Sequence, residues 1–153
     1  MAAITLETIE ARQQELGDLI AQFKAQPTSV TIPSAPIQLQ PGERYAGVVL
    51  DEQGQFKHHL ILLPQRPAKR LPWQAAMDWA EGIGGALPDR QEQALLFANC
   101  KPHLEAAWHW SCQQHDEHDY FAWLCHFGGG GQLDYHKSFE GSAVAIRLIQ
   151  IGA

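Results

Sequence analysis

The amino-acid sequence predicts an α+β fold. In the compact part of the chain a strand hairpin comes first, two helices follow, and a run of short strands ends the chain. This order differs from the repeating strand–helix order of a parallel sheet. The composition is typical of a globular protein, since 45% of the 153 residues are apolar and 18% are charged. The length suffices for one domain with a core and a short additional segment.

The first element is a helix predicted over residues 4–25, with Thr5 as a suitable N-cap residue. Its apolar side chains recur with the three- and four-residue spacing of a coiled coil, and Gln13 is the polar member of the series. The other members are Leu6, Ile9, Leu16, Ile20 and Phe23. An isolated helix of this length is marginally stable in water, so it needs a partner. Self-association as a homo-oligomer, with a trimer as the expected state, is favoured over packing on its own domain.

A proline-rich linker is predicted over residues 27–42, between the helical segment of residues 1–26 and a domain of residues 43–153. Proline restricts the backbone and lacks a backbone hydrogen-bond donor, so the linker is expected to run extended. One edge strand is expected near residues 29–32. The linker separates the helix from the domain, which is why self-association of the helix is favoured.

The domain is predicted to begin with a hairpin of residues 44–50 and 57–64. Pro72 then begins a helix that ends in a glycine-rich turn. A second helix follows Asp89, which is expected to form a capping box with Glu92 three positions later. Both helices thus lie between the hairpin and the remaining strands in chain order.

Four short strands are predicted to complete the domain. Their segments are HWSC, DYFAWLCHF, GQLDYHKSF and SAVAIRLIQI, and the loops between them are HDEHD, GGGG and EGS. Trp110 and Trp123 are expected to fill the core from adjacent strands. Arg147 lies in the apolar last strand and is expected to form a structural ion pair or hydrogen bond.

Charge and hydropathy limit the partners and the location of the chain. The formal net charge of −6 gives no general attraction to nucleic acid or to an anionic membrane. No apolar run approaches the roughly 18 residues of a membrane span, so no membrane insertion is expected. The N-terminus has acidic residues where a secretory signal peptide has a basic start and an apolar core. We therefore expect a protein of the cytoplasm, or one carried outside by an assembly.

The three cysteines are an odd number without CxxC spacing, which favours free and buried thiols. A disulfide between Cys112 and Cys125 stays open if they lie on neighbouring strands. A pair formed by Cys112 with His115 or His126 would have the groups for acyl transfer. We expect no enzyme, however, because Cys112 falls where a core strand is predicted.

The loop HDEHD, residues 115–119, contains only side chains that can bind a proton or a metal ion. His115 and His118 are spaced as zinc ligands can be, and the carboxylates would suit calcium. The sequence contains no HExxH or EF-hand motif, and a polar loop is expected between two strands in any case. No metal or cofactor is therefore predicted. A ligand-contacting loop and an inert polar loop both remain open.

An ordered set of motifs runs through residues 44–150. The motifs are Gly84–Gly85, Leu87–Arg90, Trp110–Ser111, Ala122–Trp123 and Ile146–Arg147. This set resembles a bacterial and prophage domain family of unknown function (DUF1566-like), which is similar to the C-terminal domain of collagen-like adhesins. The resemblance implies a C-type-lectin-like fold and a binding protein of the tail or receptor-recognition type. It also implies a location in the virion or in the cytoplasm of the producing bacterium.

The loops and strand ends between residues 113 and 140 are predicted to contact a glycan or protein receptor, or another virion subunit. The predicted ligand-binding residues are His115, Asp116, His118, Asp119, Tyr120, His126, Asp134, Tyr135, His136 and Lys137. Aromatic and hydrogen-bonding side chains on one exposed sheet are typical of such recognition. A purely structural virion or assembly protein and a metal- or cysteine-dependent enzyme are the competing hypotheses.

Overall fold

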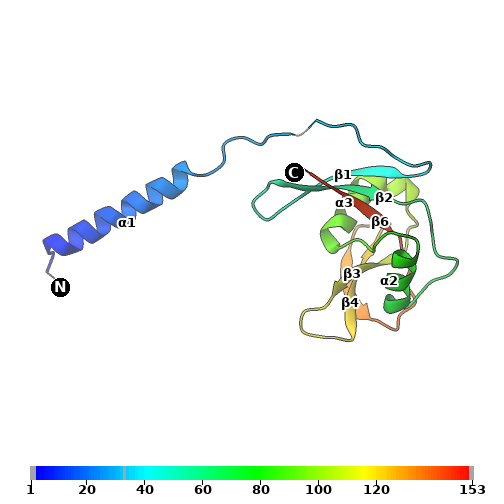
Figure 1. The fold of residues 1–153 in the computed structure, drawn as a ribbon. Helices are drawn as coiled ribbons and strands as arrows, with labels where there is room; N and C mark the ends of the chain where they lie inside the picture. The colour runs from blue at the N-terminus through cyan, green and yellow to red at the C-terminus, as the bar shows by residue number, and fades with distance from the viewer. Residues whose placement is uncertain (1–2, 33, 152–153) are drawn as a thin grey trace. The chain divides into compact units, whose positions relative to one another are not determined.

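The computed structural model describes residues 3–32 and 34–151 and divides the chain into two units, Met1–Ile32 and Pro33–Ala153 (Figure 1). The first unit contains helix α1 (Leu6–Lys24), and residues 27–32 after it form no regular structure. The edge strand expected near residues 29–32 is therefore wrong. No neighbouring strand in the described part of this unit offers the hydrogen bonds that a strand requires.

Helix α1 confirms the predicted helix to within two residues at its start and one at its end. Thr5 caps it, because its hydroxyl accepts a hydrogen bond from the backbone N–H of Thr8 at 3.2 Å. None of its side chains is buried, and Ile9 and Leu16 are 52% and 59% exposed. The apolar face of α1 is thus open to solvent. Within residues 3–32 and 34–151, no helix is long and apolar enough to cross a membrane.

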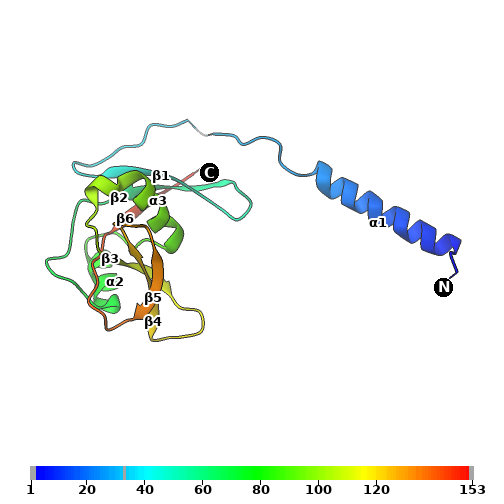
Figure 2. The ribbon, with the colours of Figure 1, turned by 180° about the vertical axis from the view of Figure 1, so that it is seen from behind.

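The second unit is a mixed α+β domain with two small antiparallel sheets (Figures 1 and 2). One sheet has the order β1 (Arg44–Leu50), β2 (Phe56–Leu62), β6 (Ile146–Gln150). The other has the order β3 (Trp108–Gln114), β4 (Phe121–His126), β5 (Gln132–His136). The helices are α2 (Trp73–Gly82), α3 (Arg90–Cys100) and the 3-10 turn η1 (Lys101–His103). The predicted α+β order is confirmed for this unit.

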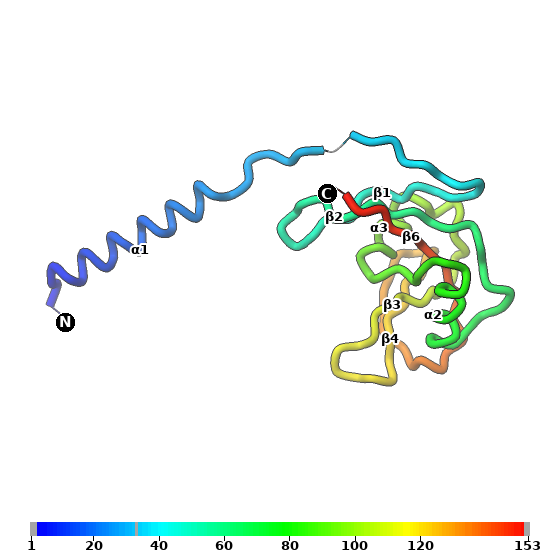
Figure 3. The backbone as a smooth tube through the Cα atoms, in the orientation of Figure 1, coloured from blue at the N-terminus to red at the C-terminus, as the bar shows by residue number. Residues whose placement is uncertain are grey.

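The last predicted strand, SAVAIRLIQI, is wrong in its first half. Residues 142–145 are buried but hydrogen-bond to two different segments instead of one neighbouring strand. The N–H of Trp110 in β3 donates to Ser142 O, and the N–H of Leu63 after β2 donates to Ala145 O. The chain enters a sheet only at Ile146, where β6 pairs with β2 (Figure 3). Residues 142–145 therefore connect the two sheets.

Two groups of buried side chains form the core. Val49, Leu60, Leu96 and Phe127 belong to the group that joins the first sheet to α3. Trp110 belongs to the second group, which joins β3 and β4 to α2. Most of these side chains are apolar, and their burial supplies the main driving force for folding.

Trp110 is buried as predicted and donates its indole N–H to Leu71 O at 2.8 Å. Gly141 crosses beside it so closely that a Cβ there would lie 2.9 Å from Trp110 Nε1, which explains the glycine. Trp123, in contrast, is only half-buried, so its predicted core position is wrong. The reason is register: Trp110 is opposite Leu124, and Trp123 therefore faces the other side of the sheet.

The expected ion pair of Arg147 is confirmed, and its partner is Glu43. Arg147 Nε and Nη2 each donate to one carboxylate oxygen at 2.8 Å, and Nη2 also donates to Gln38 O at 2.9 Å. The hydrogen bond from Arg147 lowers the pKa of Glu43. This pair fastens residues 38–43 to strand β6.

The predicted capping box at α3 is confirmed and has an additional member. The Asp89 side chain accepts from Glu92 N at 2.7 Å, and the Glu92 side chain accepts from Asp89 N at 3.0 Å. The other oxygen of Glu92 lies 3.2 Å from Nε2 of His58 in β2, and both side chains are buried. Burial raises the pKa of Glu92. The contact between Glu92 and His58 thus connects the start of α3 to the first sheet.

His109 in β3 is 2% exposed and packs against Phe127, with the ring centroids 4.5 Å apart. Its Nδ1 lies 2.8 Å from Ala107 O, and because a carbonyl only accepts, Nδ1 carries the proton. Burial lowers the pKa of His109 from 6.5 to about 4. The imidazole is therefore neutral in the folded protein at neutral pH.

His109 makes the protein less stable in mild acid. Between its folded pKa of about 4 and its ordinary value of 6.5, the unfolded chain binds more protons than the folded chain, so the free energy of unfolding falls as pH falls. The expected loss between about pH 7 and about pH 4 is about 3 kcal/mol. Urea unfolding across this range measures it.

The matched variant is His109→Gln, which removes the titrating ring but keeps a polar side chain. Its stability at neutral pH is expected to be lower, because packing on Phe127 is lost. Its stability should nevertheless depend less on pH than that of the wild type. Equal pH dependence in the two proteins would show that His109 does not titrate in this way. Carboxylates such as Glu43 contribute equally to the pH dependence of stability in the wild type and in the variant.

Candidate functional site

The loop of residues 115–119 joins β3 to β4, as predicted, and folds back on β4. The N–H of His115 donates to Phe121 O at 2.9 Å, and the N–H of Phe121 donates to His118 O at 3.0 Å. The N–H of Glu117 donates to His115 Nδ1 at 3.1 Å. These bonds hold both histidines of the loop against the side of the sheet that carries Trp123.

Six side chains form a continuous row of rings on this side of the β4–β5 hairpin, which we name the ring row. In order, they are Trp123, His115, His118, Phe121, His136 and Tyr120. The successive ring centroids are 5.8, 4.9, 6.0, 5.7 and 6.3 Å apart. These spacings lie within the range of aromatic pair contacts. Tyr120, at one end of the row, is 74% exposed.

The register of the strands explains why these rings share one side. Phe121 of β4 is opposite His136 of β5, and Trp123 is opposite Asp134. Residues paired directly across an antiparallel sheet point to the same face, and alternate residues along a strand do so too. Strand pairing therefore contributes Phe121, Trp123, Asp134 and His136, and the loop contributes the other rings.

Charged groups lie at the tryptophan end of the ring row. The Arg90 guanidinium carbon lies 3.6 Å from the ring centroid of Trp123, as in a cation–π contact. Arg90 Nε also donates to Gln132 Oε1 at 2.9 Å, which fixes the side chain. The Asp134 carboxylate lies 3.9 Å from His115 Nε2. This end of the row thus offers a cation, a carboxylate and an imidazole beside an indole face.

The ring row contains four of the ten predicted ligand-binding residues, and a fifth, Asp134, lies beside it. Asp116 and Asp119 are exposed in the loop, and Asp119 accepts from Gln114 Nε2 at 3.3 Å. They share the region of the row but contribute no ring to it.

The remaining predicted residues lie elsewhere. His126 packs edge-on against Trp108, and Tyr135 packs edge-on against Phe139, both on the opposite face of the sheet. The Lys137 ammonium lies over the Trp73 ring, 4.3 Å from its centroid. Alternation along β5 separates Tyr135 from Asp134 and His136. The predicted set therefore divides between two faces.

Sequence reasoning missed Arg90 and Trp123 as parts of this surface. The sequence pattern places Trp123 in a predicted core strand, and Arg90 belongs to the motif of residues 87–90 that precedes a helix. The period-two pattern of β4 contains the signal, since Ala122 and Leu124 are buried and Trp123 alternates with them. Which of the two alternating sets of β4 residues points toward the core, however, follows only from the pairing of β4 with β3.

The described residues contain no group of three or more His, Cys, Asp or Glu side chains placed to hold a metal ion. His115 and His118 stack face to face with 25° between their planes. The cysteines are all free, and Cys112 and Cys125 are not bridged. The arrangement offers ring faces and hydrogen-bonding edges, which bind ligands by contact.

No protein-family model matches this chain, and no curated protein matches it. The resemblance to the prophage domain family therefore stays a prediction.

Cys112 is expected to react slowly with thiol reagents. Burial, followed by the charges of Asp89 and Glu92, raises its pKa from 9.0 to about 11. Two pKa units correspond to about 100-fold less thiolate at neutral pH. Alkylation by iodoacetamide, followed at Cys112 by peptide mass spectrometry, measures this against an unfolded control. Labelling at Cys112 as fast as in the unfolded chain would contradict the prediction and favour an activated thiol.

Proposed function

We propose that this chain is a binding protein of a phage or prophage particle that contacts a glycan receptor through the ring row. Its domain would have a C-type-lectin-like fold, as the motif resemblance implies. The α+β order, the two short helices and the antiparallel pairing of all strands in the described domain are compatible with that fold. Because one fold supports many functions, the proposal rests on the surface and not on the fold.

The continuity and exposure of the ring row carry the proposal. A sugar ring has an apolar C–H face that packs on an aromatic ring and hydroxyl groups that need polar partners. Tyr120 supplies an exposed ring face at one end of the row, and the imidazoles along the row supply hydrogen-bonding edges. Asp134 and Arg90 add an acceptor and a donor at one end. Such a mixture of ring faces and placed polar groups suits an oligosaccharide.

The chemistry of the described residues supports binding and not catalysis. Cys112 has a raised pKa, the opposite of what a nucleophilic thiol needs. A surface open to solvent also lacks the exclusion of water that strengthens electrostatic catalysis. The proposed role is therefore recognition without chemical change of the ligand.

A protein receptor or another virion subunit is the second candidate, and one observation favours it. Tyrosine, tryptophan and arginine dominate the energetics of protein interfaces, and Tyr120, Trp123 and Arg90 all lie at this surface. The same residues would carry either interaction, so the nature of the ligand must be measured.

The glycan proposal predicts that Tyr120→Ala weakens binding about tenfold, because an exposed aromatic anchor is lost. The matched control is Tyr135→Ala, which removes a half-exposed tyrosine from the opposite face of the same hairpin. A glycan array identifies the ligand, and calorimetric titration compares the three proteins. The control is expected to bind like the wild type.

If Tyr120→Ala and Tyr135→Ala lose glycan affinity equally, the ring row is not the binding site. Absence of glycan binding, together with Tyr120-dependent binding of a purified virion subunit, would replace the glycan by a protein. Unchanged glycan binding in Tyr120→Ala would contradict the proposed surface directly.

We further propose that α1 joins three copies of the chain through its exposed apolar series. Leu16 lies at the centre of that series, and Ala11 lies on the opposite side of the helix by heptad position. Leu16→Asp is expected to give a monomer, because it places a charge in the coiled-coil seam. Ala11→Asp should keep the oligomer, because its side chain faces solvent. Sedimentation equilibrium measures both, and a monomeric wild type would contradict the trimer.

A further inference from the structure

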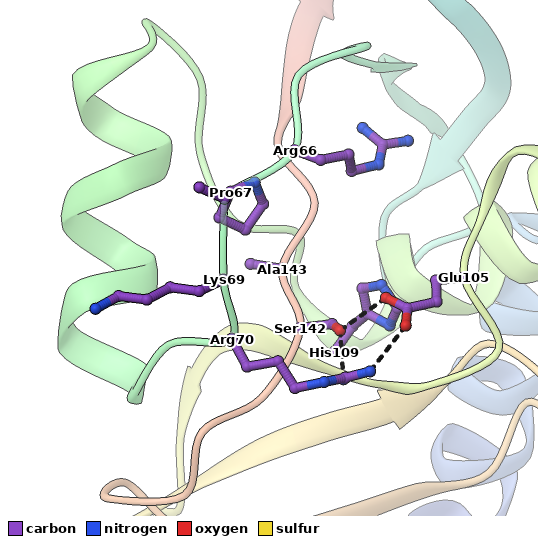
Figure 4. A pocket seen from close by; sticks show the side chains of 9 residues that line it. Arg66, Pro67, Lys69, Arg70, Glu105, His109, Ser142 and Ala143 are labelled. Carbon is purple, nitrogen blue, oxygen red and sulfur yellow. Dashed lines mark hydrogen bonds and ion pairs between the residues drawn. The ribbon is translucent and has the colours of Figure 1, made fainter.

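A second candidate site lies away from the ring row, at a cavity of about 290 Å³ beside the loop that follows β2 (Figure 4). Its lining residues are Arg66, Pro67, Ala68, Lys69, Arg70, Glu105, His109, Ser142 and Ala143. They come from the loop after β2, from the turn before β3, from β3 and from the buried connection to β6. None of them belongs to the ring row.

The buried imidazole of His109 is the polar group that points to a ligand. Its Nδ1 uses its proton on Ala107 O, so Nε2 is left as a hydrogen-bond acceptor. Within the described residues, Nε2 has no hydrogen-bond partner, although His109 is 2% exposed and lines the cavity. This acceptor is not sealed from solvent, so water or a ligand in the cavity can donate a hydrogen bond to it. The cavity is therefore suited to a molecule that brings a hydroxyl or N–H group.

The side of the cavity near β3 is organised by a hydrogen-bonded triad (Figure 4). Arg70 Nη1 donates to Ser142 Oγ at 2.6 Å, and Arg70 Nη2 donates to Glu105 Oε1 at 2.8 Å. The Ser142 hydroxyl donates in turn to Glu105 Oε2 at 3.1 Å. The guanidinium is thereby held in place before any ligand arrives, which lowers the entropy cost of binding.

Arg66 adds a second guanidinium whose partners are neutral. Its Nη1 donates to Leu63 O and Gln65 O at 2.6 and 2.7 Å, and its Nη2 donates to His103 O at 3.2 Å. In the part of the chain that the structure describes, no carboxylate pairs with it. Figure 4 shows the Lys69 side chain directed away from the other lining residues. The lining thus carries two guanidinium groups, Arg66 and Arg70, and one carboxylate, Glu105, and one positive charge is left for an anion.

We infer that this cavity binds a small hydroxylated carboxylate, with its carboxylate toward Arg66 and Arg70 and a hydroxyl donating to His109 Nε2. One negative charge balances the excess, whereas a dianion would meet Glu105. Arginine matches a carboxylate in shape and charge. The volume is close to the lower limit of about 300 Å³ for small-molecule pockets, so one sugar-sized molecule fits. An acidic sugar at the end of a glycan and a free hydroxy acid share this chemistry. The inference does not depend on the proposed function of the ring row.

Titration of the full-length chain with sodium glucuronate tests this inference, with glucose and acetate as probes that each lack one feature. Glucuronate is expected to bind saturably. Glucose and acetate are expected to bind about tenfold more weakly or worse, because glucose lacks the carboxylate and acetate lacks the hydroxyl groups. The ring resonances of His109 in a histidine-labelled sample should move with glucuronate. This readout uses the wild-type protein and so requires no variant to fold.

Two variants locate the site. Arg70→Gln is expected to weaken glucuronate binding about tenfold, because a charge-assisted pair becomes a neutral one. Lys69→Gln removes the same charge from the neighbouring position and should bind like the wild type. Ser142→Ala leaves the charges in place and should weaken binding less than Arg70→Gln. Melting temperatures without ligand check that each variant is folded.

Two further probes distinguish an acidic sugar of a glycan from a free hydroxy acid. Tighter binding of methyl glucuronide than of glycerate would indicate an acidic sugar of a glycan, and the reverse would indicate a free hydroxy acid. The inference is overturned if glucuronate does not bind and the His109 resonances stay in place. It is also overturned if Arg70→Gln and Lys69→Gln bind glucuronate as the wild type does.

Discussion

The buried segment of residues 142–145 is the connection on which the arrangement of the domain depends. Its backbone accepts a hydrogen bond from Trp110 of β3 at one end and from Leu63, directly after β2, at the other. Buried peptide groups must find partners, so these bonds define where the segment lies. Its side chains are small and buried. Strand β6 then begins at Ile146 and joins β2.

Both candidate binding surfaces follow from this arrangement. One face of the second sheet turns Trp110 toward α2, so the opposite face is left for Trp123 and the ring row. The cavity forms where the segment passes β3, since Ser142 and His109 come together there. The contact that unites the sheets also provides the hydroxyl that orients Arg70.

The two surfaces have different chemistry and share no residue. The ring row is open and aromatic, and it offers extended contact with weakly directional polar groups. The cavity is small and charged, and its donors and acceptors are held by hydrogen bonds within the protein. The histidines of the two surfaces differ in their exposure to solvent. His109 is buried and neutral, and His118 lies exposed in a stack of rings. Burial and neighbours, not residue type, decide which role each histidine has.

The features that depend on near neighbours in the chain follow from the amino-acid sequence alone. The α+β order, the capping box of Asp89 and Glu92, and the hairpin loop of residues 115–119 follow from local hydrogen bonding and periodicity. The side chains that meet across the sheets, in contrast, depend on long-range strand pairing. Shifting the register by one residue would exchange the faces of Trp123 and Leu124, and no local signal specifies that register. The cavity at His109 likewise joins residues far apart in sequence, because long-range backbone hydrogen bonds bring them together.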